Sequence, residues 1–147
     1  MMKKSENTLK LQFDSLSQNE SLARSLAAAF VAQLNPTVAE LADIKCAVSE
    51  AVTNCTVHAY RDTVGPIYII MNAYADRKIK IEIRDSGCGI PDVETAMQPL
   101  YTTDAENERS GMGFTVMDSF MDGLTVRSRP GKGTKVTMIK KLSILPR

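Results

Sequence analysis

The stretch Ile79-Lys80-Ile81-Glu82-Ile83-Arg84-Asp85-Ser86-Gly87-Cys88-Gly89-Ile90 organises the rest of the chain. Its first half alternates apolar and polar residues, which predicts a strand with one buried face. Its second half reads Asp-x-Gly-x-Gly, where glycine lets the backbone turn sharply and lets a ligand approach the main chain. Asp85 then ends a rigid strand as a pure hydrogen-bond acceptor, suited to a planar donor such as the exocyclic amine of adenine. An ordinary Asp-Gly turn explains the same residues equally well, so the flanking sequence has to decide.

The composition is that of a globular protein with one domain. The chain has 147 residues, 44% hydrophobic and 24% charged, which suffices for a single domain over residues 1–147. The net charge of +1 gives no electrostatic basis for binding nucleic acid or an anionic membrane. No apolar run approaches the roughly 20 residues of a membrane span. Because the start is polar and the three cysteines lack metal-ligand spacing, we expect reduced thiols and a cytoplasmic location.

A strand and a helix open the predicted fold. Apolar residues alternate with polar ones at residues 9–13, and turn residues follow. The helix after them carries an apolar stripe on one face, with smaller apolar residues beside it. The stripe consists of Leu22, Leu26, Phe30 and Leu34, and the residues beside it are Ala23, Ala27 and Val31. Arg24 stands apart from this stripe, and a solvated charge is the simpler interpretation of that position.

The second helix carries a row of polar residues. It is expected to run from a cap at Thr37 to about Tyr60. Glu50, Asn54 and His58 lie four residues apart, so they share one side of the helix, beside its apolar stripe. A Glu can serve as a general base, and an Asn amide oxygen is a suitable ligand for Mg²⁺. The alternative is an ordinary solvated helix face.

The remaining sequence predicts three strands, a helix and a long loop. A strand at 67–74 forms an antiparallel hairpin with the opening stretch. Residues 91–110 show no sustained period, which in a compact domain is typical of a lid or binding loop. Ser110-Gly111-Met112-Gly113-Phe114 opens a helix whose N-terminus suits phosphate. Two strands at 124–129 and 134–142 follow.

In this order and at these separations, the motifs resemble the four ATP-binding boxes of the GHKL superfamily of gyrase, Hsp90, histidine kinases and MutL. The resemblance implies the Bergerat fold, a two-layer α/β sandwich with helices on one face of a mixed, mostly antiparallel sheet. It also implies ATP and Mg²⁺ as cofactors, with Asn54 as the Mg²⁺ ligand and Asp85 on adenine. The residues that match the boxes are Glu50, Asn54, Asp85, Gly87, Gly89, Gly111, Gly113 and Thr134.

Further motifs narrow the resemblance to the anti-sigma-F family of endospore-forming bacteria, over about Leu9 to Leu142. That family is a serine protein kinase that phosphorylates an anti-anti-sigma partner. As a homodimer it also holds a sporulation sigma factor inactive. The matching motifs are Leu16-Ser17-Gln18-Asn19-Glu20-Ser21 with Ala23-Arg24, Ser-Glu-Ala-Val-Thr-Asn at 49–54, Gln98-Pro99-Leu100 with Thr102-Thr103, and Glu108-Arg109-Ser110-Gly111-Met112-Gly113-Phe114.

The narrower resemblance implies a role for individual residues. Glu50 is the implied catalytic base, Arg109 lies in the lid near the γ-phosphate, and Arg24 lies on the partner-binding face. Two positions depart from the family pattern, because Ala59 replaces an expected glycine and Cys88 separates two glycines; neither change removes a ligand. Further nucleotide contacts are implied for Thr102, Thr103, Ser110 and Met112.

Two other functions compete with the kinase. One is an ATP-gated anti-sigma binding module with little or no kinase activity, which the acid at Glu50 disfavours. The other is the catalytic fragment of a histidine kinase. His58 disfavours it, because this histidine falls inside the nucleotide box itself.

Overall fold

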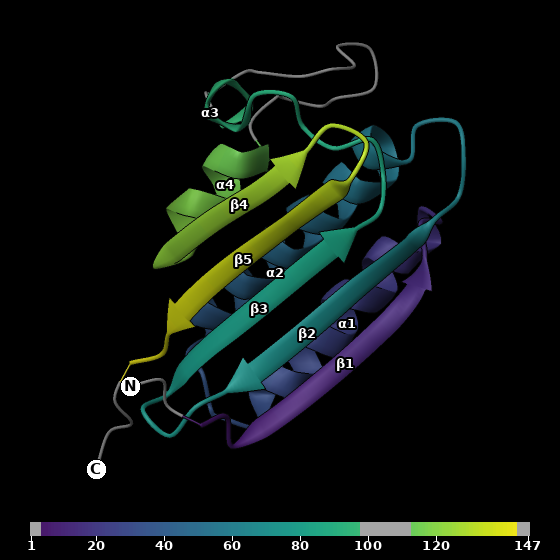
Figure 1. Cartoon of the computed structure of the whole chain (residues 1–147). Helices are drawn as coiled ribbons and strands as arrows, with labels where there is room; N and C mark the ends of the chain where they lie inside the picture. The colour runs from purple at the N-terminus through teal and green to yellow at the C-terminus, as the bar shows by residue number, and fades with distance from the viewer. Residues whose placement is uncertain (1–3, 98–112, 144–147) are drawn as a thin grey trace.

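The computed structural model describes residues 4–97 and 113–143. Strands and helices follow one another along the chain in nearly the predicted order (Figure 1). The difference is one additional helical turn, α3, inside the segment expected to be irregular. The elements are β1 (Asn7–Asp14), α1 (Gln18–Ala32), α2 (Val38–Asn54), η1 (Cys55–Ala59), β2 (Pro66–Ala73), β3 (Lys78–Asp85), α3 (Val93–Ala96), α4 (Gly113–Phe120), β4 (Gly123–Arg129) and β5 (Gly133–Lys141).

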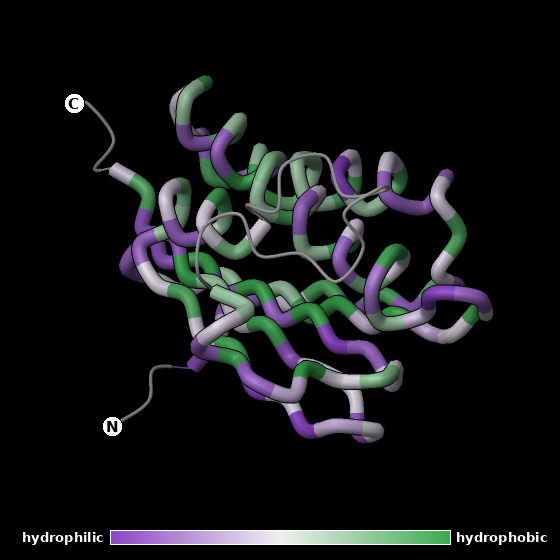
Figure 2. The backbone as a smooth tube through the Cα atoms, turned by 90° about the horizontal axis from the view of Figure 1, so that it is seen from above, coloured by the Kyte–Doolittle hydropathy of each residue, from purple (hydrophilic) through white to green (hydrophobic). Residues whose placement is uncertain are grey.

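Within the described residues, five strands form one sheet in the order β1-β2-β3-β5-β4. The helices cover one face of this sheet, and Figure 2 shows the two layers, so the expected α/β sandwich is confirmed. All described pairings are antiparallel, whereas a mixed sheet was expected. The reason is that the β4–β5 hairpin inserts β5 between β3 and β4. Strands β3 and β4 therefore run in the same direction but do not pair with each other.

The alternation in β3 determines where the opening stretch points. Ile79, Ile81 and Ile83 are buried against the helices, and each contributes roughly 1.5–3 kcal/mol by leaving water. Because side chains repeat every second residue, Asp85 falls on the same buried face at the end of the strand. The sheet therefore places a carboxylate beneath the helix layer.

Helix α1 buries only part of the predicted apolar stripe, together with the smaller residues expected beside it. Ala23, Ala27, Phe30 and Val31 face the core, while Leu22 remains 47% exposed. Alanine lets α1 approach the neighbouring α2 closely, so the small side chains occupy the contact. The predicted stripe of larger residues is wrong at Leu22.

Helix α2 begins as predicted and ends in an unexpected way. The Thr37 hydroxyl accepts a hydrogen bond from the Glu40 N–H (3.0 Å), and the Glu40 carboxylate accepts one from the Thr37 N–H (2.8 Å). This capping box stabilises the helix by about 1 kcal/mol. After Asn54 the helix widens into the π-turn η1, closed by a hydrogen bond from the Tyr60 N–H to the Cys55 carbonyl (3.1 Å). Such π-bulges are frequent at functional sites.

In the part of the chain that the structure describes, no helix is long and apolar enough to cross a membrane.

Candidate functional site

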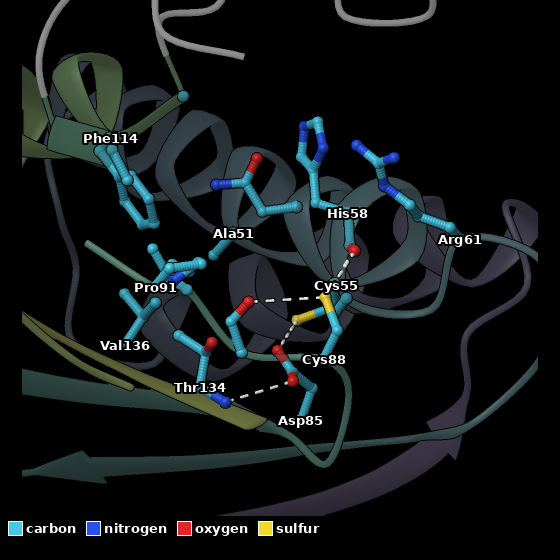
Figure 3. A pocket seen from close by; sticks show the side chains of 16 residues that line it. Ala51, Cys55, His58, Arg61, Asp85, Cys88, Pro91, Phe114, Thr134 and Val136 are labelled. Carbon is cyan, nitrogen blue, oxygen red and sulfur yellow. Dashed lines mark hydrogen bonds between the residues drawn. The ribbon is translucent and has the colours of Figure 1, made fainter. Parts of the chain in front are cut away.

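A pocket of about 610 Å³ lies between the helix layer and one end of the sheet (Figure 3). Its walls come from α2, η1, the loop after β3, α3, the start of α4 and the start of β5. This volume suits a small-molecule ligand, and most such sites combine an apolar lining with a few placed polar groups. Asn54, Asp85 and Thr134 are among the polar residues. The apolar part of the lining includes Ile90, Ala96, Phe114 and Val136.

Asp85 is the buried acceptor of the pocket and is only 5% exposed. Its Oδ1 accepts hydrogen bonds from the N–H groups of Gly87 (2.9 Å) and Thr134 (3.2 Å), and its Oδ2 from the Cys55 thiol (3.5 Å). Burial raises the pKa of Asp85 above its ordinary value, although these donors act in the opposite direction. A carboxylate has about four acceptor positions, so three donors leave one for a ligand. The adenine contact of Asp85 stays a prediction.

Cys55 lines the pocket and contacts Asp85, which the sequence pattern did not reveal. Its position fits the apolar stripe of the second helix, and adjacency to Asn54 is the only signal that could have marked it. Burial, and then the negative charge of Asp85, raise the pKa of this thiol well above its ordinary value. The thiol therefore stays protonated at neutral pH and acts as a donor to Asp85.

The loop after β3 packs closely on the end of η1. A Cβ at Gly87 would overlap the carbonyl group of Ala59, and its distance from the Ala59 Cβ would be 2.6 Å. Because Gly87 has no side chain, the methyl group of Ala59 fits at this position of the expected glycine. Cys88 also lines the pocket and holds its Sγ 3.3 Å from the His58 carbonyl oxygen.

Asn54 lies against the start of α4 as the structure describes it. A Cβ at Gly113 would lie 3.1 Å from Asn54 Oδ1, so the absence of a side chain lets the helix start against the amide. Glu50 lies one turn earlier on α2 and is half-buried. Among the described residues that line the pocket, Asn54 and His58 are present and Glu50 is not. Arg61, from the loop after η1, also lines it, and no pattern in the sequence predicted this.

The donor set fits Mg²⁺ bound together with phosphates. In the described ranges, no three His, Cys, Asp or Glu side chains are grouped so that they could hold a metal ion. Mg²⁺ usually takes one or two protein oxygens and completes its shell with water and substrate phosphates. The amide oxygen of Asn54 can supply one such ligand.

Comparison with known proteins agrees with this arrangement. A family model described as the histidine kinase-like ATPase domain matches residues 13–140, which include all the pocket residues named above. The chain belongs to this family.

Two relatives within this ATPase family are similar to the chain over nearly its whole length. An anti-sigma F factor of Caldanaerobacter subterraneus subsp. tengcongensis is 61% identical over 134 residues, which are 91% of this chain and 93% of the relative. An anti-sigma F factor of Clostridium botulinum (strain Alaska E43 / Type E3) is 53% identical over 140 residues, covering 95% and 98%.

A solved structure shows the same ATPase fold. The crystal structure of the RsbU and RsbW domains of a Mycobacterium tuberculosis protein matches with a TM-score of 0.70 at 18% identity. The match covers 96% of this chain and 34% of that one. At this identity the likeness concerns the fold alone.

Arg24, which the sequence assigned to the partner-binding face, is not among the described residues that line the pocket. Arg24, on α1, places its Nη1 3.2 Å from Glu20 Oε1. The same Glu20 oxygen accepts a hydrogen bond from the Ser49 hydroxyl, next to Glu50 on α2. The following residues lie outside the described ranges, and their roles in this ATPase domain stay predictions: Thr102, Thr103, Arg109, Ser110, Gly111 and Met112.

Proposed function

We propose that this chain is an anti-sigma factor and an ATP-dependent protein-serine kinase of the cytoplasm. It binds a sporulation sigma factor and phosphorylates a serine of an anti-anti-sigma partner, and it acts as a homodimer. The observation that carries the proposal is the pocket with a buried acceptor, Asp85, and an amide ligand, Asn54, beside the first turn of α4. The similarity to relatives named anti-sigma F factor supports the choice of partners.

The residues divide the chemistry among them. Asp85 accepts a hydrogen bond from the adenine amine, and the apolar lining encloses the base. Asn54 would hold Mg²⁺ through its amide oxygen, and the ion would offset negative charge on the phosphates. Glu50 accepts the proton of the partner's serine hydroxyl, so that the serine oxygen forms a bond to the γ-phosphorus as the bond to ADP breaks. Arg109 is the predicted cation near the γ-phosphoryl group.

One observation favours an ATP-gated anti-sigma module with little kinase activity. Glu50 is not among the described residues that line the pocket, and a base has to come within hydrogen-bond reach of its proton. Both functions share the nucleotide site and differ only in the role of this carboxylate.

The Glu50→Gln variant tests the kinase. Incubated with labelled ATP and the anti-anti-sigma partner, it should transfer phosphate roughly 10²–10⁴-fold more slowly than the wild type while still binding ATP. The matched control is Glu82→Gln, which makes the same change on the open face of the sheet, where Glu82 forms an ion pair with Lys80. This control should retain the full rate.

Three outcomes separate the alternatives. A full rate for Glu50→Gln would show that this residue is not the base. Absence of phosphoryl transfer by the wild type, with sigma-factor binding retained, would identify the binding module. If the wild type binds neither the sigma factor nor the anti-anti-sigma partner, the anti-sigma assignment is refuted.

A further inference from the structure

A second hollow, of about 650 Å³, lies at the same end of the sheet as the nucleotide pocket, beside the β4–β5 hairpin. Five of its twelve described lining residues are cations, and they come from three strands and one turn. Asp85 is the only acid among the described lining residues, and its oxygens already accept three hydrogen bonds. The cationic residues are Arg84, Arg127, Arg129, Lys132 and Lys135.

Strand register sets three of these charges side by side on the open face of the sheet. Arg84 is the direct cross-strand partner of Lys135, and Lys135 is the direct partner of Arg127. Neighbouring strands lie about 4.8 Å apart, and like charges directly opposite each other destabilise a sheet. Among the described residues, none of the five cations forms an ion pair. Within the described part of the chain, no ion pair therefore compensates this positive row across β3, β5 and β4.

We propose that this cationic hollow is a docking site for an acidic segment of a protein partner. The proposal rests on the proposed function, which requires two protein partners. Arginine presents its donors as a planar fork that matches a carboxylate in a bidentate arrangement, and two of the three cations in the row are arginines. Acidic side chains of a partner would relieve the repulsion that the row imposes on the sheet.

Two other occupants fit less well. A second copy of this chain that used the same face would bring like charges together, because a two-fold interface is self-complementary. Single-stranded nucleic acid binds on open aromatic platforms beside basic grooves. Tyr68 is the cross-strand partner of Arg84, and the Arg84 guanidinium already covers its ring, 4.8 Å from the centroid.

The test reverses two charges of the row in the full-length protein. The Arg127→Glu/Lys135→Glu variant is compared with Lys10→Glu/Lys141→Glu, which carries the same change in net charge on strands β1 and β5 but outside the hollow. Affinities for the sigma factor and for the anti-anti-sigma partner are measured with Mg²⁺-ATP over a range of NaCl concentrations. ATP affinity is measured in parallel, because Asp85 and Thr134 line both cavities.

We expect the hollow variant to bind one of the two partners at least tenfold more weakly and with less dependence on salt, since complementary charges steer association. The control and the ATP affinity should be unaltered. The neutral variant Arg127→Gln/Lys135→Gln should give an intermediate affinity, which guards against a fold defect caused by the charge reversal.

If the Arg127→Glu/Lys135→Glu variant binds both partners with the same affinity as the wild type, this inference alone is overturned. Failure of the wild type to bind either partner would refute the proposed function, and this inference with it. If the hollow variant keeps its affinity for both partners but loses self-association, the hollow is an interface with a second copy of this chain. If it instead loses binding to single-stranded DNA, the hollow is a nucleic-acid site. Either result overturns this inference.

Discussion

At the scale of single residues, Asp85 decides what the pocket can bind. It is held by three protein donors and retains one acceptor position for a ligand. Asp85→Asn should weaken ATP binding by about 1.5–3 kcal/mol, roughly 10- to 150-fold, because an amide is a weaker acceptor than a carboxylate. Calorimetry measures this change, with Asp14→Asn at an exposed strand end as the control. Equal affinities for Asp85→Asn and the wild type would refute the adenine assignment.

The thiol of Cys55 should control the pH dependence of the same contact. Burial raises the pKa of Asp85, so acidification protonates it at a higher pH than an ordinary Asp. The Cys55 hydrogen bond lowers this pKa, so Cys55→Ala should raise it further and shift the acid loss of ATP affinity toward neutral pH. Cys46→Ala, at an exposed position of the same helix, should keep the wild-type profile. Superimposable pH profiles for both variants would show that the thiol does not act on Asp85.

At the scale of secondary structure, two glycines at the β4–β5 turn allow the cost of backbone strain to be measured apart from the cost of steric overlap. Gly131 and Gly133 both have positive φ, of +75° and +86°. A Cβ at Gly131 would meet nothing within 4 Å, whereas one at Gly133 would overlap the Asp85 carbonyl group. Gly131→Ala should cost only the backbone strain, about 1–2 kcal/mol.

Gly133→Ala should cost more than Gly131→Ala. It should also weaken ATP binding, because it pushes the start of β5, and with it the Thr134 N–H, away from Asp85. Chemical denaturation gives both free energies of unfolding. A Gly133→Ala variant no less stable than Gly131→Ala would mean that the turn relaxes without cost.

The contact between α1 and α2 connects the expected partner surface to the helix that carries Glu50. Arg24 pairs with Glu20, and Glu20 also binds Ser49. Arg24→Ala should reduce partner binding and leave ATP affinity unaltered, because Arg24 is not among the described pocket residues. Alanine is preferred to glutamate at this position, because Arg24→Glu would place a second negative charge beside Glu20. Unaltered binding of both partners to Arg24→Ala would reduce this residue to a solvated charge.

At the scale of the whole molecule, the pocket joins the helix layer to the sheet, so a nucleotide should stabilise the entire fold. Its walls come from α2, η1, α4, β3 and β5. ATP with Mg²⁺ at about 100 times its Kd should raise the free energy of unfolding by about 2.7 kcal/mol. Denaturation with and without nucleotide measures this shift, and Asp85→Asn should show a smaller one at the same concentration. A denaturation midpoint that nucleotide does not move would contradict the site.

The parts of this protein that sequence determined are those set by local periodicity. Alternation in β3 predicted the buried face on which Asp85 lies, Thr37 marked the start of α2, and the glycine-rich segment at 110–114 predicted the opening of a helix there. The order of the motifs was enough to indicate an ATP site. These features depend on neighbours within one or two turns of chain, and adjacent residues encode them directly.

Tertiary structure alone decided the features that join distant segments. The sequence does not reveal that Cys55 donates to Asp85, that Leu22 remains exposed, or that β5 lies between β3 and β4. The positive row of Arg84, Lys135 and Arg127 likewise exists only through the register of three strands. Such contacts arise when packing compensates the entropy of closing long loops, and no local pattern records which segments will meet.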